Sequence, residues 1–186
     1  MELSEQEQVR REKLEKIKSL GINPYPAELY PVSDYSIDIK NNFKENSKVV
    51  LAGRLMSRRI QGNASFAELQ DSKGRIQLYF NRDEICSGED KTSYNELYKK
   101  LLDIGDIIGV EGELFKTKVG EKTVLVKNFK LLSKSLRPLP LPKEDSDGNI
   151  YDEFNDPELR YRQRYVDLIV NSGVKEAFVK RTLITN

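Results

Sequence analysis

Apolar and polar residues alternate along residues 48 to 82, and this alternation is the clearest pattern in the chain. Successive side chains of a β-strand point to opposite faces, so a period of two predicts strands with one buried face. The pattern predicts three strands: 48–60, 64–70 and 75–82. The residues expected to face a core are Leu51, Gly53, Leu55, Ala67, Leu69, Ile76, Leu78 and Phe80. The opposite face would carry Arg54, Met56, Arg58, Phe66, Glu68, Arg75, Gln77 and Tyr79.

Two more strand patterns follow at 106–117 and 122–132, and a helical pattern at 93–103 separates them from the first three. Turn sequences join consecutive strands at 71–74 and 118–121. Five strands with a helix between the third and the fourth is the arrangement of an OB-fold barrel. We therefore predict a mainly β protein with a five-stranded OB-fold barrel, an N-terminal α-helix and a C-terminal helical extension. A sandwich of short antiparallel strands is the alternative, for which five strands are few.

The N-terminal helix is predicted over residues 4–20. Ser4 and Glu7 have the spacing of a capping box, in which each side chain accepts a hydrogen bond from the other residue's backbone. The polar face of this helix carries Arg10 and Arg11 among lysines and glutamates. Such charges are typical of a solvated helix face with i,i+4 pairs. The sharper hypothesis is a basic surface that follows an RNA backbone.

Segments rich in proline and in acidic residues divide the chain into parts. Residues 1–47 would hold the N-terminal helix and a segment that wraps the surface, and 48–136 the barrel. Residues 137–157 are interpreted as a linker, and 158–186 as the start of a further domain, helical in two pieces. The last helical pattern reaches residue 186 with neither a C-cap nor a proline, which predicts that a larger domain follows.

The composition indicates binding rather than catalysis. The 186 residues include no histidine and a single cysteine, Cys86, which removes the commonest general base and leaves little for a nucleophilic dyad. The sequence has neither a glycine-rich phosphate loop nor a convincing set of metal ligands. We therefore predict no catalytic residue, no metal site and no cofactor in this chain. The lone cysteine and the lack of a membrane-spanning apolar run predict a cytoplasmic protein without a membrane partner.

The net charge of +1 gives the chain no overall attraction for a polyanion, but residues 54–82 hold six basic residues against two acidic ones. An exposed Phe66 beside Arg58 and Gln77 suits unpaired nucleotide bases. The ring stacks on a base, the amide reads a base edge, and the cation meets phosphate. Two plainer interpretations stay open: Phe66 could belong to the core, and Arg58 could pair with Glu68 on the next strand.

Five segments, in this order, resemble bacterial-type class II lysyl-tRNA synthetases: RREKLEKIKSLGINPYP, AGRLMSRRIQGNASFAELQDSKGRIQLYF, GELFKTKVGE, LLSKSLRPLP and RYRQRYVDLI. In that family the N-terminal OB-fold domain binds the tRNA anticodon, and a phenylalanine stacks on the central uridine. The resemblance implies this role for Phe66, and contacts to the same base for Arg58 and Gln77. It also implies a lysine tRNA as partner and, for the full-length enzyme, ATP, magnesium and a homodimer.

The family usually carries an acidic residue on the last strand, near the first anticodon base, and the segment VKNFKLL places Asn128 there. Candidate contacts to the RNA backbone are Arg10, Arg11, Arg59, Arg75, Lys116 and Lys118. The segments that bind ATP and lysine in the family are absent, so this chain alone is not expected to charge tRNA. Three alternatives stay open: an aspartyl- or asparaginyl-tRNA synthetase domain, an OB module that binds single strands without sequence preference, and a protein-interaction domain that uses the N-terminal helix.

Overall fold

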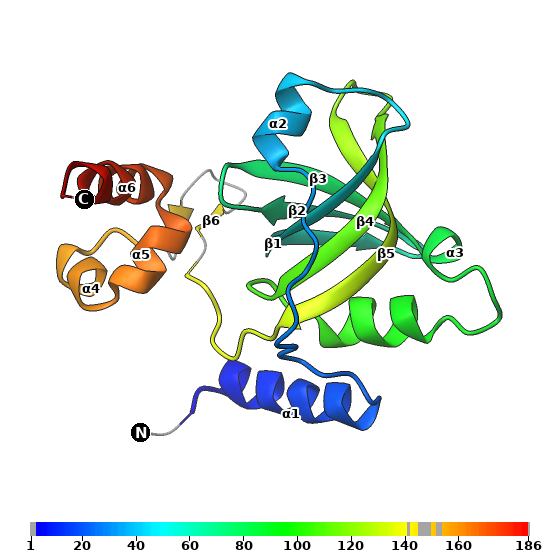
Figure 1. Ribbon diagram of the computed structural model, residues 1–186. Coiled ribbons are helices and arrows are strands. Elements are labelled where there is room, and N and C mark those ends of the chain that lie inside the picture. Colours follow the sequence, from blue (N-terminus) through cyan, green and yellow to red (C-terminus); the bar gives the residue numbers. More distant parts are fainter. Residues whose placement is uncertain (1–2, 141, 145–149, 152–153, 186) are drawn as a thin grey trace. The chain divides into compact units, whose positions relative to one another are not determined.

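The computed structural model describes residues 3–140, 142–144, 150–151 and 154–185, which fall into two compact units, Met1–Pro138 and Leu139–Asn186. The first unit is built on five strands that close into a barrel (Figure 1). These strands are β1 (Lys48–Gln61), β2 (Ala64–Gln70), β3 (Arg75–Asn81), β4 (Ile107–Lys116) and β5 (Lys122–Ser133). Their order around the barrel is β1-β2-β3-β5-β4, and β4 pairs back with β1. The predicted five-stranded barrel is thus confirmed.

Every strand pair is antiparallel except β3 with β5, which run parallel. Along each strand, buried apolar residues alternate with more exposed ones, as the sequence predicted, and the buried ones fill the barrel interior. The fully buried strand residues include Leu51, Leu55, Leu69, Leu78, Phe80, Ile108, Val110, Val124 and Val126. Burial of this apolar surface is the main stabilising contribution to the fold.

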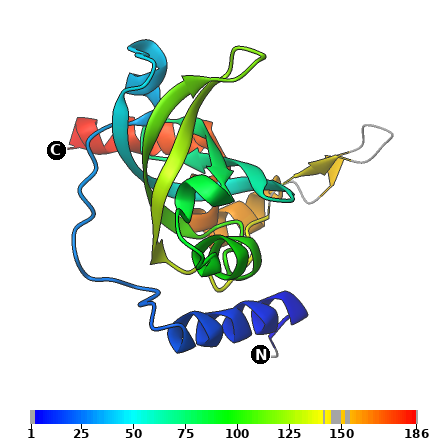
Figure 2. The same ribbon diagram turned by 90° about the vertical axis from the view of Figure 1, so that its right-hand side faces the viewer.

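Helices close the two ends of the barrel. The π-type helix η1 (Ser93–Leu101) lies between β3 and β4, where the sequence predicted a helix, and it follows the short α3 (Arg82–Ile85). The Tyr98 ring of η1 stacks on Phe80 with centroids 4.0 Å apart, so η1 completes the core. Together with α1 (Glu5–Ser19) it lies at one end, whereas α2 (Ser36–Asn41) lies at the other (Figure 1; Figure 2).

Helix α1 begins with the predicted capping box. The Glu7 amide donates to the Ser4 hydroxyl at 3.3 Å, and the Ser4 amide donates to the Glu7 carboxylate at 3.0 Å. These bonds satisfy amides that have no partner inside the helix. Leu14 and Ile17 are its buried residues, so the helix is held mainly by one apolar edge.

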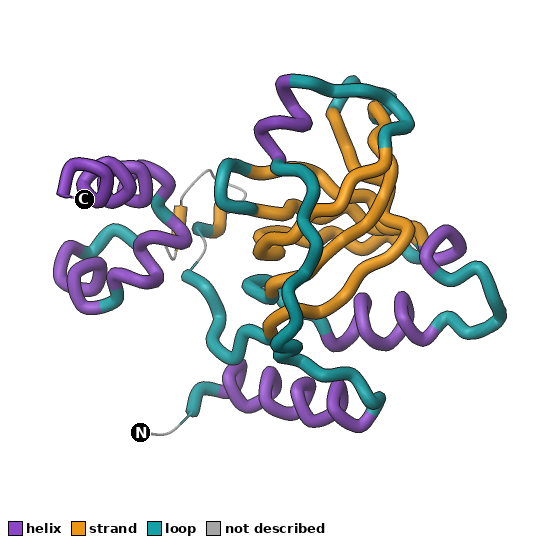
Figure 3. Tube along the Cα trace, in the orientation of Figure 1, coloured by secondary structure: helices purple, strands orange, loops and turns teal. Residues whose placement is uncertain are grey.

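The segment between α1 and α2 runs along the outside of the barrel (Figure 3). The Ser33 amide donates to the Val50 carbonyl of β1 at 3.0 Å, and the Tyr30 ring covers Gly109 of β4. A Cβ atom at position 109 would lie 2.4 Å from Tyr30 Cζ, so only glycine admits the ring there. This segment therefore carries α2 to a defined place on the barrel.

The second unit contains a two-stranded hairpin and three helices. Its elements are β6 (Lys143–Glu144), β7 (Ile150–Tyr151), α4 (Pro157–Arg162), α5 (Arg164–Val170) and α6 (Ser172–Thr185). The sequence predicted two helical pieces here; the structure divides the first of them again, into α4 and α5. At Gln163 the backbone leaves the helical region (φ −118°, ψ 53°), which separates α4 from α5. The buried Asp167 carboxylate pairs with Arg160 across that break and with Arg164 within α5.

Candidate nucleic-acid interface

A bulge in β1 decides which side chains share the outer face of the barrel. The pairing of β1 with β2 shifts between Leu55 and Ser57, so Met56 is an extra residue and is buried, with 4% of its surface exposed. The alternation is interrupted at that point. The prediction that Met56 points outward was therefore wrong, and every residue of β1 after it lies on the face opposite to the one expected.

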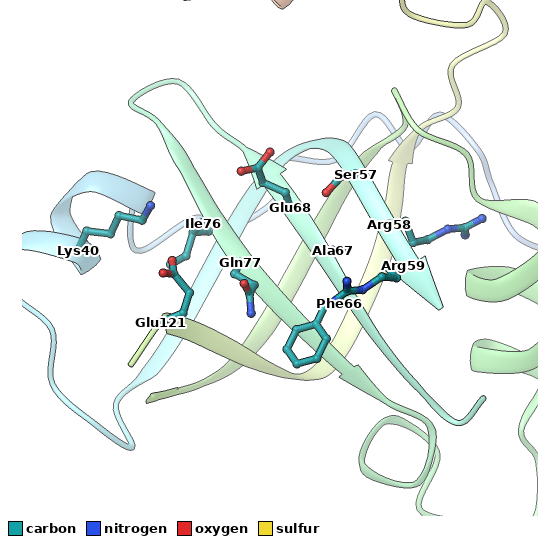
Figure 4. A pocket seen from close by; sticks show the side chains of 10 residues that line it. All are labelled: Lys40, Ser57, Arg58, Arg59, Phe66, Ala67, Glu68, Ile76, Gln77 and Glu121. Carbon is teal, nitrogen blue, oxygen red and sulfur yellow. The ribbon is translucent and has the colours of Figure 1, made fainter. Parts of the chain in front are cut away.

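Beyond the bulge, Arg58 pairs with the buried Ala67, whereas Arg59 pairs with Phe66. Paired residues of neighbouring strands lie on the same face of a sheet. Arg59 thus shares the outer face with Phe66, and Arg58 does not, which corrects the predicted position of Arg58. Figure 4 shows Arg59 directed toward the Phe66 ring and Arg58 directed away from it.

Arg58 has a partner of its own in η1. Its guanidinium donates to the Tyr98 carbonyl, and its Cζ lies 5.4 Å from the centroid of the Tyr98 ring. The Tyr98 hydroxyl is hydrogen-bonded to Ser65 at 2.7 Å, and burial raises the pKa of this hydroxyl above its usual range. Arg58 therefore links β1 to the helix that closes the barrel.

Phe66 lies on the outer face, half-buried and outside the core. Its ring packs against Tyr79 of β3 with centroids 4.9 Å apart, and Tyr79 in turn meets Phe115 of β4 at 5.9 Å. The interpretation of Phe66 as a core residue is thereby excluded. Gln77 stands two residues before Tyr79 on β3 and shares its face.

An open pocket of about 400 Å³ lies in front of Phe66 (Figure 4). Its lining comes from β1, β2, β3, the end of α2 and the turn between β4 and β5. The lining residues are Lys40, Ser57, Arg58, Arg59, Phe66, Ala67, Glu68, Ile76, Gln77 and Glu121. Three residues predicted to contact the central base, Arg58, Phe66 and Gln77, therefore line one pocket, although the Arg58 side chain points away from the Phe66 ring. Arg59 joins them from the set expected to contact the RNA backbone.

Among the described residues, four charged or amide side chains at this pocket are unengaged: Lys40, Arg59, Gln77 and Glu121. Within the part of the chain that the structure describes, none of these four makes a side-chain hydrogen bond or ion pair. By contrast, Glu68 is paired with Arg75 at 3.0 Å, and Arg75 also donates to Gln70 at 2.9 Å. The pocket thus offers two cations, an amide and a carboxylate to a ligand.

Lys40 and Glu121 were missed by the sequence interpretation. Helix α2 is fixed by Asp71 in the β2–β3 turn, whose carboxylate accepts from the Ser36 amide at 2.5 Å and from the Ser36 hydroxyl at 2.8 Å. Lys122 donates to the Lys40 carbonyl at the other end of α2. No local sequence pattern signals the position of α2, because the residues that these hydrogen bonds join are 35 and 82 positions apart in the sequence.

The pocket has two acidic residues, Glu121 and the Glu68 that is paired with Arg75, and Asn128 does not line it. β5 pairs with β3 only from Thr123 to Val126, and Asn128 follows a bulge, exposed and opposite Glu111 of β4. Asn128 therefore does not join Phe66 and Gln77 at this pocket, and its expected place near the first anticodon base stays a prediction.

The other predicted RNA contacts, except Lys118, are engaged elsewhere. Arg10 donates to the carbonyls of Ile104 at 2.9 Å and Ser135 at 3.0 Å, so its guanidinium docks α1 on the barrel. Arg11 donates to a carbonyl within its own helix. Lys116 lies over the Phe43 ring at 5.5 Å, and Lys118 is exposed in the β4–β5 turn.

Both the barrel and the whole chain are similar to known proteins. Residues 49–132 match a family described as the OB-fold nucleic acid binding domain. Over its whole length the chain is 72% identical to a lysine–tRNA ligase of Christiangramia forsetii, of which it covers 32%. Lysine–tRNA ligases of Porphyromonas gingivalis and Azobacteroides pseudotrichonymphae are 56% and 58% identical over 100% and 99% of the chain. The chain spans about a third of the length of these relatives.

The closed barrel and the matching domain family define the class: this is an OB-fold nucleic-acid-binding protein. The identity across the whole chain narrows that class, and it bears out the resemblance seen in the sequence segments. The chain belongs to the lysine–tRNA ligase family.

In the described ranges there is no group of three or more His, Cys, Asp or Glu side chains placed to hold a metal ion. No helix among the described residues is long and apolar enough to cross a membrane.

Proposed function

We propose that the outer face of the barrel binds the anticodon of a lysine tRNA, with its central base stacked on Phe66. The observation that carries this proposal is the pocket in which an accessible ring is surrounded by unengaged polar side chains. Burying such groups without partners is costly, so surfaces that keep them open are suited to a polar ligand.

Each side chain has a role that follows from its chemistry. The Gln77 amide can donate and accept, which matches a uracil edge that offers carbonyl oxygens and one N–H. Glu121 can accept a hydrogen bond from a base N–H. Arg59 takes the role that the sequence assigned to Arg58, and it contacts the base or its phosphate. Lys40 and the exposed Lys118 supply charge for the RNA backbone.

Arg10 and Asn128 are left out of the proposed set. The Arg10 guanidinium is occupied by carbonyl oxygens, and Asn128 does not line the pocket. Arg58 is assigned a positioning role, since it holds η1 to β1. Arg75 is assigned to the pair with Glu68.

For the longer protein we infer an enzyme that joins lysine to its tRNA with ATP and magnesium, as a cytoplasmic homodimer. The names of the relatives and their greater length support this inference. The division of the chain into 1–47, 48–136, 137–157 and 158–186 belongs to the same proposal, with 158–186 as the beginning of the catalytic part.

The first prediction tests RNA recognition. Anticodon stem-loops carrying UUU, GUC and GUU differ in their outer bases, and we expect the UUU stem-loop to bind most tightly. Each phosphate contact lowers log K by about 0.7 per unit of log salt for a single strand, so a few contacts give a slope of roughly −2 to −3. Filter binding at several salt concentrations measures both quantities. Equal affinity for the three stem-loops at every salt concentration would contradict recognition of a lysine anticodon.

The second prediction compares two adjacent arginines. Arg59→Ala should lower stem-loop affinity by roughly 10- to 150-fold, the effect of one charge-assisted hydrogen bond, and leave the urea midpoint unchanged. Arg58→Ala should lower the free energy of unfolding by about 1.5–3 kcal/mol, because it removes the charged contact to Tyr98. Urea titration and stem-loop binding on both variants make the comparison. If Arg58→Ala instead lost RNA affinity at unchanged stability, the placement of Arg59 rather than Arg58 on the face of Phe66 would be refuted.

A further inference from the structure

Asp71 does not line the pocket in front of Phe66, but it holds the helix that supplies one of the pocket's cations. It is buried in the turn between β2 and β3, and its carboxylate accepts four hydrogen bonds. Two come from the amide and the hydroxyl of Ser36, the first residue of α2. The other two come from the Lys73 and Gly74 amides, each at 2.8 Å. One side chain thus fixes both the turn and the start of α2.

The two oxygens of this carboxylate have different partners. Oδ2 accepts from the Ser36 amide, whereas Oδ1 accepts from the Ser36 hydroxyl and from both turn amides. An asparagine has one acceptor oxygen, and its NH₂ group only donates. If that oxygen serves the three donors at Oδ1, the NH₂ group meets the Ser36 amide, donor against donor. Asp71→Asn should therefore weaken the attachment of α2 and keep the turn.

Helix α2 has few other attachments. It is six residues long, and so short a helix has little stability of its own. Ile39 packs in the core, and Lys122 donates to the Lys40 carbonyl at the helix end. The ion pair of Asp38 with Lys73, at 2.7 Å, is half-exposed, and such pairs contribute little. The buried bonds to Asp71 are therefore a large part of what sets the position of α2.

Lys40 is the residue through which the position of α2 reaches the pocket. It lies four residues after Ser36, about one helical turn, so a displaced start of α2 displaces Lys40 as well. Figure 4 shows Lys40 reaching from α2 on one side of the pocket, with Phe66 on the other. A flexible lysine binds phosphate as a point charge, and its contribution depends on where its stem begins.

We propose that Asp71 is a positioning residue for RNA binding: it holds α2 where Lys40 meets the RNA backbone. This inference rests on the proposed anticodon binding. It predicts an effect opposite to that of charge alone, because removing a carboxylate makes the surface less negative and by itself favours RNA. A loss of affinity in Asp71→Asn has to come through the position of Lys40.

The salt dependence of stem-loop binding tests this role. Filter binding of the UUU stem-loop is measured for Lys40→Ala, Asp71→Asn and the double variant. One lost phosphate contact reduces the salt slope by about 0.7, so affinity relative to the wild type should fall about fivefold for each tenfold drop in salt. We expect this change in each single variant and no further change in the double variant, because both substitutions remove the same contact.

Asp38→Asn is the matched control. It removes the same charge from the same helix without touching Ser36, so it should keep the wild-type slope and bind at least as tightly as the wild type. Ser36→Ala is the second variant, to be used if Asp71→Asn does not fold. It removes one of the two bonds between α2 and Asp71, and it should reduce the slope in the same direction. Urea midpoints and stoichiometric titration give the folded fraction of each protein.

The outcomes separate this inference from the proposed function. A loss in Asp71→Asn that is equal at every salt concentration, or that adds to the loss in Lys40→Ala, would mean a merely structural role and refute positioning. A wild-type slope in Asp71→Asn, or in Ser36→Ala where it stands in, also refutes it. If Lys40→Ala binds like the wild type while Phe66→Ala loses affinity, positioning fails and anticodon binding stands. If the wild-type chain binds no stem-loop, both fail.

Discussion

Replacing Phe66 by alanine should lower the affinity for the UUU stem-loop by roughly 5- to 150-fold, the range expected from base–aromatic stacking at about 1–3 kcal/mol per base. The fold should survive, because the ring lies on the outer face and contacts Tyr79 rather than the barrel core. A buried phenylalanine behaves differently, since its truncation costs about 3–5 kcal/mol of stability.

Stem-loop affinity and urea midpoint, measured on the same Phe66→Ala preparation, decide between these possibilities. Gln77→Ala is the companion variant: it should narrow the difference between stem-loops with uridine and cytidine at the centre, because it removes contacts to a base edge. A Phe66→Ala chain with wild-type affinity, or with a midpoint lowered as far as a core truncation predicts, would rule out the stacking role.

Replacing Lys134 by alanine should lower the free energy of unfolding by about 3–5 kcal/mol, because one partner of a buried ion pair is lost and the other is left uncompensated. The Lys134 amine is fully buried and lies 2.6 Å from the Asp103 carboxylate and 2.8 Å from that of Asp106. Burial raises the pKa of Asp106 even beside this lysine, and removing the lysine strips away the charge that opposes that shift.

This loss should also loosen α1. Lys13 of that helix pairs with Asp103 at 2.5 Å, so the same carboxylate joins the helix to the end of β5. Lys130→Ala is the matched control, because Lys130 pairs with Glu28 at 3.1 Å on the surface, where such pairs contribute about 0–1 kcal/mol. Urea denaturation of both variants provides the test. Equal midpoints for the two variants would contradict a stabilising role of the buried cluster.

Local patterns were enough to predict most of the architecture. The period of two located all five strands, the capping box located the start of α1, and the apolar spacing at 93–103 located η1. The capping box depends on interactions between residues close in the chain. The strands and η1 depend on the regular spacing of the apolar residues that face the core. Phe66 and Gln77 were predicted correctly to lie on the outer face for the same reason, since β2 and β3 have an unbroken alternation.

The composition of the site was decided by tertiary structure. A single extra residue at Met56 exchanged the faces of Arg58 and Arg59, and no local feature of the sequence announces it, because a bulge is defined by the partner strand. Lys40 reaches the pocket through hydrogen bonds to the β2–β3 turn and to β5, and Glu121 reaches it because β5 pairs with β3 across a crossover. The sequence by itself therefore determined the barrel and the position of the Phe66 ring on its outer face. The three-dimensional pairing of distant segments decided which charges surround that ring, because charge placement depends on register between strands and not on the pattern within one.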